Sequence, residues 1–402
     1  MNFRIPALVA CLAGCSLSAP AHAKITFSFD YSLDTGFFTK NPAAKTALER
    51  AATVYSDRML DQLTDITPGN GNTWNTVFSN PSTGASVMET DLTIPANVIK
   101  VYVGGANLGG ALGQGGPGGF SGSGDDTFSS NLQFRGQLGA MNTPPTDFAR
   151  WGGTISFDQG VSWNFDLNGP VSGKNDFLTV ATHELAHVLG FGTSPSWRTF
   201  LTKNQSTQQY VGPFTGPKSQ ALYGGPVPLE TPAPGGNAQH FNNNVMSTVA
   251  GVAQETLMDP DITTGTRKKV TLLDWAALDD IGWDLAKGGD ATADGSVDFN
   301  DLVKLAQNYN VTDGQRRWSD GDFNYDGNVD FNDLVLLAQN YNTTGVQGAA
   351  SLTLAAGESS ASFAADWERA QAVAGVPEPS VLALGGVFFA SAMLRRSRAR
   401  RV

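Results

Sequence analysis

Cysteine is almost absent from this chain. Only Cys11 and Cys15 occur, and both lie within the first 23 residues. That segment has a basic residue, an apolar stretch and the tripeptide Ala21-His22-Ala23, which is the order of a secretory signal peptide over residues 1–23. Once this signal is removed, the chain contains no disulfide, no catalytic thiol and no cysteine ligand for a metal. We therefore expect an exported protein that is stabilised by packing and by bound ions.

The leader also permits a second interpretation. Leu12-Ala13-Gly14-Cys15 resembles a bacterial lipoprotein box, which would attach a lipid to Cys15. Both routes take the protein out of the cytoplasm.

Positive charge is scarce as well. The chain has 26 Lys and Arg residues against 37 Asp and Glu, which gives a net charge of -11 at pH 7. Proteins that bind a phosphate backbone carry excess positive charge, so we expect no nucleic acid partner. The content of 41% hydrophobic and 16% charged residues is typical of a folded protein, and 402 residues suffice for two or three domains.

Long apolar runs are absent except near the two ends. Val376-Pro377-Glu378-Pro379 precedes an apolar segment over residues 381–394 and an arginine-rich end. This segment is shorter than the roughly 20 residues that cross a bilayer comfortably, so an ordinary short anchor is one interpretation. The order resembles the PEP-CTERM sorting signal, which implies that residues 376–402 form a short transmembrane sorting segment cut by an exosortase-type enzyme. The protein would then be extracellular or held in the cell envelope.

Hydrophobic periodicity predicts an α+β fold for the first part of the chain. The stretch 104–124 is so rich in glycine that we expect a loop there, either a solvated spacer or the rim of a cleft. The predicted strands cover residues 25–32, 98–103, 154–158 and 161–166, and predicted helices cover 41–62 and 177–189.

The second of these helices carries the sequence His183-Glu184-Leu185-Ala186-His187. Asn175 or Asp176 can cap its start, and glycines follow its end. Residues four apart share one face of a helix, so His183 and His187 can bind the same Zn²⁺. Glu184 is adjacent and can reach a metal-bound water without ligating the metal.

A catalytic zinc site needs a third protein ligand. The sequence has only four histidines, and His22 belongs to the signal peptide, so His240 is the predicted third ligand. A downstream carboxylate such as Glu230 or Glu255 would take that place in a gluzincin-type site. A purely structural interpretation remains, in which the histidines only pack on a helix face and in a loop.

The run from His183 to Gly190 resembles the metzincin metallopeptidases. Where these enzymes usually carry the third histidine, the chain has Thr193, but the leishmanolysin-like branch places that ligand after a long insertion, as His240 would be. The resemblance implies an α+β catalytic domain over residues 24–287, with a twisted sheet, an active-site helix and a small C-terminal subdomain. It also implies a methionine turn at Met258, with Met246 as the weaker candidate, and a closing helix over 271–283.

The resemblance implies hydrolysis of peptide bonds in a protein or peptide substrate. Three neutral imidazoles leave the charge of Zn²⁺ uncancelled, so a bound water would have a pKa near ~7. Glu184 would act as the general base. The predicted function is therefore a secreted zinc-dependent endopeptidase.

Beyond residue 287 the sequence contains an internal repeat at a spacing of 32 residues. Each copy has a glycine at position 6 of a loop and oxygen-bearing residues at positions 1, 3, 5, 9 and 12, as Ca²⁺ coordination requires. The first loop offers Asp290, Thr292, Asp294, Asp298 and Asp301, and the second offers Asp322, Asn324, Asp326, Asp330 and Asp333.

Aspartate at position 12, followed by Leu-Val and an apolar helix, resembles the dockerin duplicate. This implies a small α-helical calcium-binding domain over residues 288–345, with a cohesin-like receptor as a partner. Thr292 departs from the pattern, so we expect the first site to be weaker. Residues 346–375 are rich in Ala, Ser and Gly and are predicted to be a linker. The alternative function is a non-catalytic calcium-binding envelope or adhesion protein that retains the zinc fold.

Overall fold

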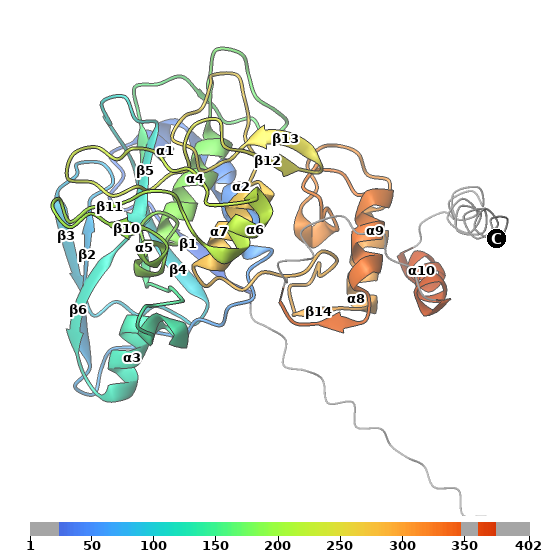
Figure 1. The fold of residues 1–402 in the computed structure, drawn as a ribbon, viewed down its shortest axis with the longest axis horizontal. Coiled ribbons are helices and arrows are strands. Elements are labelled where there is room, and N and C mark those ends of the chain that lie inside the picture. The colour runs from blue at the N-terminus through green and yellow to red at the C-terminus, as the bar shows by residue number, and fades with distance from the viewer. Residues whose placement is uncertain (1–23, 347–360, 375–402) are drawn as a thin grey trace, which may run out of the picture.

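A computed structural model describes residues 24–346 and 361–374 of the chain (Figure 1). The predicted signal peptide, with Cys15, and the predicted sorting segment 376–402 lie outside these residues. Across the two described ranges, no helix has the length and apolar character needed to cross a membrane. Helices and strands are mixed and the sheets are open, which confirms the α+β class at that level.

The main sheet has four strands in the order β1-β4-β7-β5. The first three are parallel, whereas β5 runs antiparallel to β7 at the edge of the sheet. Side chains alternate between the faces of a strand, so Val101 and Val103 of β4 enter the main core while Tyr102 enters a smaller core on the opposite face. The strands are β1 (Thr26–Asp30), β4 (Val98–Ala106), β7 (Gly152–Asp158) and β5 (Gly113–Pro117).

The smaller core lies under a three-stranded antiparallel sheet, in the order β3-β2-β6. Trp74 of β2 and Trp151 are fully buried there and meet edge to face, with ring centroids 6.2 Å apart. The elements of this region are β2 (Thr73–Ser79), β3 (Ser86–Thr90), β6 (Gly119–Ser123), α3 (Asp126–Phe134) and the 3-10 helix η1 (Leu138–Met141).

Helices α2 (Pro42–Ser56) and α4 (Phe177–Val188) pack against each other on the main core, preceded by the short α1 (Phe37–Lys40). Residues 41–62 were predicted to be one helix, but α2 ends at Ser56. The chain leaves the helix because Leu60 donates its amide hydrogen to the Asp284 carbonyl at 2.9 Å, pairing with the segment that leads into the repeats.

The prediction of a loop over residues 104–124 is wrong, because β5 and β6 both lie within it. Glycine is required in β5 because this strand contacts α4 directly. A Cβ atom added at Gly115 would lie 2.5 Å from the backbone oxygen of Glu184. Gly115 therefore permits close packing of β5 against α4. The predicted strand 161–166 is reduced to two residues, β8 (Trp163–Asn164), which pair with β9 (Asn175–Asp176) just before α4.

After α4 the chain continues through short helices and strands. The predicted closing helix is present as α7, and the Thr271 side chain caps it together with Asp274. These elements are α5 (Pro195–Thr199), β10 (Thr202–Lys203), β11 (Tyr210–Val211), α6 (Pro217–Tyr223), β12 (Met246–Val249), β13 (Val252–Glu255) and α7 (Leu272–Asp280).

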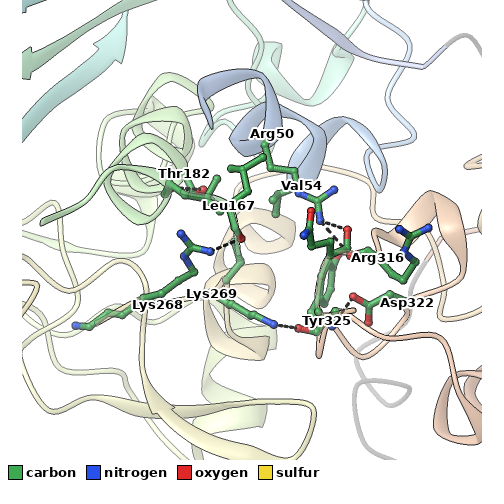
Figure 2. Close-up of a pocket in the computed structure, with 15 residues that line it drawn as sticks. Arg50, Val54, Leu167, Thr182, Lys268, Lys269, Arg316, Asp322 and Tyr325 are labelled. Atoms are coloured by element: carbon green, nitrogen blue, oxygen red, sulfur yellow. Dashed lines mark hydrogen bonds between the residues drawn. The ribbon is translucent and has the colours of Figure 1, made fainter. Parts of the chain in front are cut away.

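The repeats form a helical unit with a core of its own. Helix α10 lies inside the predicted linker 346–375 and packs against α8, with Trp367 buried and its ring 5.1 Å from that of Tyr309. The unit also meets the first part of the chain at a pocket that contains Arg50, Lys269 and Tyr325 (Figure 2). Its elements are β14 (Ser296–Val297), α8 (Phe299–Asn308), η2 (Trp318–Asp320), α9 (Phe331–Asn340), β15 (Thr343–Thr344) and α10 (Ala361–Ala374).

Candidate metal centre

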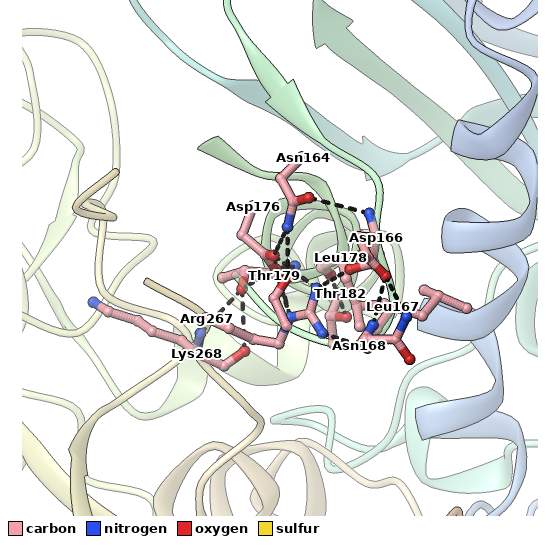
Figure 3. A network of polar contacts seen from close by, with 11 residues as sticks. Asn164, Asp166, Leu167, Asn168, Asp176, Leu178, Thr179, Thr182, Arg267 and Lys268 are labelled. Carbon is pink, nitrogen blue, oxygen red and sulfur yellow. Dashed lines mark hydrogen bonds and ion pairs between the residues drawn. The ribbon is translucent and has the colours of Figure 1, made fainter. Parts of the chain in front are cut away.

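Helix α4 begins at a buried polar network (Figure 3). The Asp176 carboxylate accepts the amide hydrogen of Thr179 at 3.0 Å, which caps the helix as the sequence predicts. Arg267 forms an ion pair with the same carboxylate at 2.8 Å. This ion pair joins the segment between β13 and α7 to the start of the histidine-bearing helix.

The other end of α4 is fixed by residues that follow the histidines. Gly190 has φ +101°, in the left-handed region that favours glycine. The Thr193 hydroxyl donates to the His187 carbonyl at 2.8 Å. Thr193, which stands where a third histidine is usual, thus caps the helix instead of facing the metal site.

The three predicted ligands converge. His187 Nε2 lies 3.1 Å from His183 Nε2 and 2.9 Å from His240 Nε2. Among the described residues, these histidines are the one group of three or more His, Cys, Asp or Glu residues placed to hold a metal ion, and their ligand atoms lie within 4.8 Å of one another. A tetrahedral metal with bonds of 2.0–2.1 Å places its nitrogen ligands about 3.3 Å apart, close to the two separations from His187.

The hydrogen bonds made by the other ring nitrogens determine the tautomer of each imidazole. His183 Nδ1 lies 2.9 Å from the Leu257 carbonyl, and His187 Nδ1 lies 2.8 Å from the Phe191 carbonyl. His240 Nδ1 lies 2.7 Å from Oε1 of Glu230. Carbonyl and carboxylate oxygens only accept, so each Nδ1 carries the proton and each Nε2 presents a lone pair.

Three lone pairs that face one point repel one another unless a cation lies between them. Burial and the neighbouring imidazoles lower the pKa of His183 to about 3 and hold the pKa of His187 well below its usual value. Both rings are therefore neutral at pH 7, which is the form that binds a metal. The residues present fit a single metal ion.

The two carboxylates considered as alternative third ligands have other roles. Glu230 accepts from the far side of the His240 ring and so orients a ligand. An isolated bridge between Leu229 and Phe241 places the two residues side by side. Glu255 forms an ion pair with Lys268 at 3.0 Å. Neither belongs to the group that converges on the metal position.

Met258 lies in a turn directly connected to the site. Its side chain is buried in the main core, and its carbonyl accepts the amide hydrogen of Phe241 at 2.9 Å, beside His240. The Asp274 carboxylate accepts the amide hydrogens of Leu257 at 2.9 Å and Met258 at 3.1 Å. Met246, the weaker candidate, is about half exposed. The role of Asp274 left no signal in the sequence, because its partners lie 16 and 17 residues away.

Glu184 lines the same cavity as His183 and His240. Burial raises its pKa to about 8, and a hydrogen bond from the Gly115 backbone acts in the opposite direction. A cation on the neighbouring imidazoles would lower this pKa toward neutrality. Glu184 is therefore a carboxyl group that can both accept and release a proton near pH 7.

The two loops of the repeat unit have the expected turns. Gly295 and Gly327, at position 6, have φ of +81° and +92°. The carboxylates at positions 1 and 12 are buried, and Asp322 Oδ1 has no hydrogen-bond partner. Burial, with neighbouring carboxylates as a further cause, raises the pKa of Asp290 to about 7. Buried carboxylates of this kind fit a divalent cation.

The other loop residues are placed less uniformly. Asp298 and Asp330 cap α8 and α9 through amide hydrogen bonds of 2.7 Å each, and Asp301 and Asp333 complete the two capping boxes. Thr292, which departs from the calcium-loop pattern, donates a hydrogen bond from its hydroxyl to the Asp301 carboxylate at 3.0 Å. The acidic oxygens, Asp294 and Asp326 included, are not gathered as closely as the three imidazoles.

Searches of protein-family models, curated proteins and solved structures all returned no match for this chain.

Proposed function

We propose that the protein is an exported zinc-dependent endopeptidase whose site follows the metzincin plan with a distant third histidine. The observation that carries this proposal is the convergence of three imidazole Nε2 atoms in a cavity that Glu184 also lines. The lone pairs supply the metal ligands, and the carboxyl group supplies a base.

Zinc is the proposed metal because neutral imidazoles are among its usual ligands. Three of them leave one coordination position for a reactant, as catalytic zinc sites require. When bound, zinc would lower the pKa of a water ligand to about 7 and polarise a peptide carbonyl.

Glu184 accepts a proton from the attacking water and passes it to the leaving amine. A carboxyl group with its ordinary pKa would be a weak base for this step. Burial raises the pKa of Glu184 and so makes it a stronger base. The contact of Gly113 and Gly115 with Glu184 holds the side chain at the wall of the cavity.

A protein or peptide substrate is proposed because β5 forms the edge of the main sheet beside Glu184. An extended peptide can add to such an edge through backbone hydrogen bonds. Gly113 of β5 lines the same cavity as Glu184, which places this edge next to the proposed base.

The two loops of the repeat unit are proposed as dockerin-like calcium sites, and a cohesin-like receptor is the proposed partner of that unit. The orphaned Oδ1 of Asp322 supports cation binding at the second loop. The signal peptide and the PEP-CTERM-like end support export to the cell envelope, with an exosortase-type enzyme acting on the tail.

The test is cleavage of casein or gelatin by the full mature chain, with phenanthroline as a zinc chelator and Ca²⁺ present throughout. We expect one zinc per chain, loss of cleavage with phenanthroline and recovery when zinc is restored. A chain that holds zinc but cleaves no protein would overturn the proposal and favour the non-catalytic calcium-binding envelope or adhesion protein.

A further inference from the structure

One residue of the second calcium loop belongs to two cores at once. Tyr325, at position 4 of that loop, packs against both the main core and the core of the repeat unit. Its ring stacks on Trp275 of α7, with centroids 5.9 Å apart and planes 20° from parallel. The first loop has Ala293 at the same position, which cannot make such a contact.

The backbone of Tyr325 has φ +63°, in the left-handed region, like Ala293 with φ +54°. This conformation is unfavourable for a non-glycine residue. Loop closure is what imposes it, so the ring of Tyr325 is presented to Trp275 only when the loop keeps this turn.

The second loop and the segment before it are held on the main domain by charged side chains (Figure 2). Lys269 Nζ donates to the Tyr325 carbonyl at 2.7 Å. Arg50 donates to the carbonyls of Gln315 at 2.7 Å and Arg316 at 3.1 Å. The Arg58 guanidinium lies 4.7 Å from the ring centroid of Trp275, adding a cation–π contact.

Helix α7 connects this contact to the histidine site. Trp275 faces the second loop, while its neighbour Asp274 accepts the amide hydrogens of Leu257 and Met258. The Leu257 carbonyl in turn accepts from Nδ1 of His183 at 2.9 Å. A shift of α7 would therefore move the acceptor that orients the His183 ring.

The second loop contains a buried carboxylate with an unused ligand atom. Asp322 is 2% exposed, and its Oδ1 has no hydrogen-bond partner. Carboxylates gathered in one loop repel one another and favour its opening. Calcium binding would remove that repulsion and keep Tyr325 in its turn.

We propose that the second calcium loop controls the histidine site through Tyr325, Trp275 and Asp274, whereas the first loop does not. This inference rests on the proposed function in taking the histidine site to hold zinc. The contacts run without a break from Tyr325 to His183, and packed side chains and hydrogen bonds of this kind can carry coupling between two sites. Typical coupling changes an affinity by 5- to 150-fold, and we expect about a tenfold effect of Ca²⁺ on zinc retention.

The experiment compares the full mature chain with three variants, with and without Ca²⁺. Asp326→Ala disables the second loop at position 5, and Asp294→Ala is its matched control in the first loop. Tyr325→Ala gives the second loop the residue found in the first. Two readouts are used: the rate of zinc transfer to a chromogenic chelator, and hydrogen exchange of peptides that contain Leu257 and Met258.

Calcium is expected to slow zinc transfer about tenfold and to slow exchange at Leu257 and Met258 in the wild-type chain and in Asp294→Ala. Neither effect should occur in Asp326→Ala. Tyr325→Ala should still bind two Ca²⁺ by calorimetry but lose both effects. Equal responses of the two loop variants, or a full response of Tyr325→Ala, would overturn the inference. Hydrogen exchange requires neither zinc nor hydrolysis, so failure of the peptidase proposal would be recognised separately.

Discussion

Glu230 Oε1 and His240 Nδ1 lie 2.7 Å apart, on the side of the imidazole that faces away from the other histidines. The carboxylate fixes the tautomer of the ring and increases its basicity at Nε2. Glu230, an alternative third ligand in the sequence analysis, therefore supports the candidate ligand His240 instead. This relationship makes the metal affinity of the site dependent on a side chain that does not touch the metal position.

Replacing Glu230 should weaken metal binding without abolishing it. We expect Glu230→Ala to lower zinc affinity about 10- to 100-fold, because the His240 ring loses its orienting partner. Competition with a chelator of known affinity measures the change. Glu255→Gln is the matched control, since Glu255 pairs with Lys268 and not with a histidine. Equal losses in both variants would contradict the role given to Glu230.

Glu184→Gln should separate metal binding from hydrolysis. The side chain keeps its size against Gly113 and Gly115 but loses its basicity. We expect one zinc per chain and a fall in kcat/KM of about 100- to 10,000-fold, the usual contribution of a general base. Metal analysis and cleavage of a quenched fluorescent peptide check both parts. Near-normal turnover would show that another group accepts the proton.

The glycines of β5 offer a test of the contact between sheet and helix. A Cβ at Gly115 would meet the Glu184 carbonyl oxygen at 2.5 Å, whereas a Cβ at Gly116 has nothing within 4 Å. We expect Gly115→Ala to destabilise the fold by about 1–3 kcal/mol, as overpacking does, and to reduce hydrolysis. Gly116→Ala should leave both nearly unchanged. Denaturant unfolding of the two variants provides the comparison.

Acid should relieve repulsion among the carboxylates of Asp61, Asp147 and Asp284. Burial, with the charge of Asp284 as a further cause, raises the pKa of Asp147 to about 6, and the pKa of Asp61 is also raised. The folded state then binds more protons than the unfolded state between about pH 6 and the ordinary value of 3.8. The contribution of Asp147 to stability therefore falls as pH rises through this range.

Asp147→Asn removes this charge while its side chain can still accept from the Phe148 amide. At pH 7 the variant should be more stable than the wild type by about 1 kcal/mol, because solvent screens a half-buried carboxyl group. Near pH 3.5 the difference should vanish. Unfolding curves of both proteins should be recorded in the presence of a chelator, so that metal release does not contribute to the difference. A constant difference across this pH range would refute the assignment.

Residues that act within one helix or one loop could be predicted because their spacing determines their geometry. His183, Glu184 and His187 share α4, and Gly295 and Gly327 form turns that depend only on local backbone. His240 was predicted from the scarcity of histidine, and the fold brings it to the same point. Glu230 and Asp274 could not be assigned their roles, because their partners depend on how distant segments are placed.

Two stretches were misjudged because composition does not distinguish solvent from close packing. Glycine in residues 113–117 indicates only a missing side chain, and here the vacated space is filled by α4. The Ala-rich stretch that includes α10 has little helix-specific patterning, but burial of Trp367 against the repeat unit stabilises it.

By itself, the sequence determined the local chemistry of this protein: a helix with two imidazoles and a carboxyl group, and two acidic loops with glycine turns. Only the tertiary structure decided which distant groups complete these sites, with Glu230 behind His240, β5 against Glu184 and Tyr325 against Trp275. The reason is physical. Hydrogen bonds within a helix or turn follow from covalent spacing, whereas contacts between segments depend on how the whole core packs.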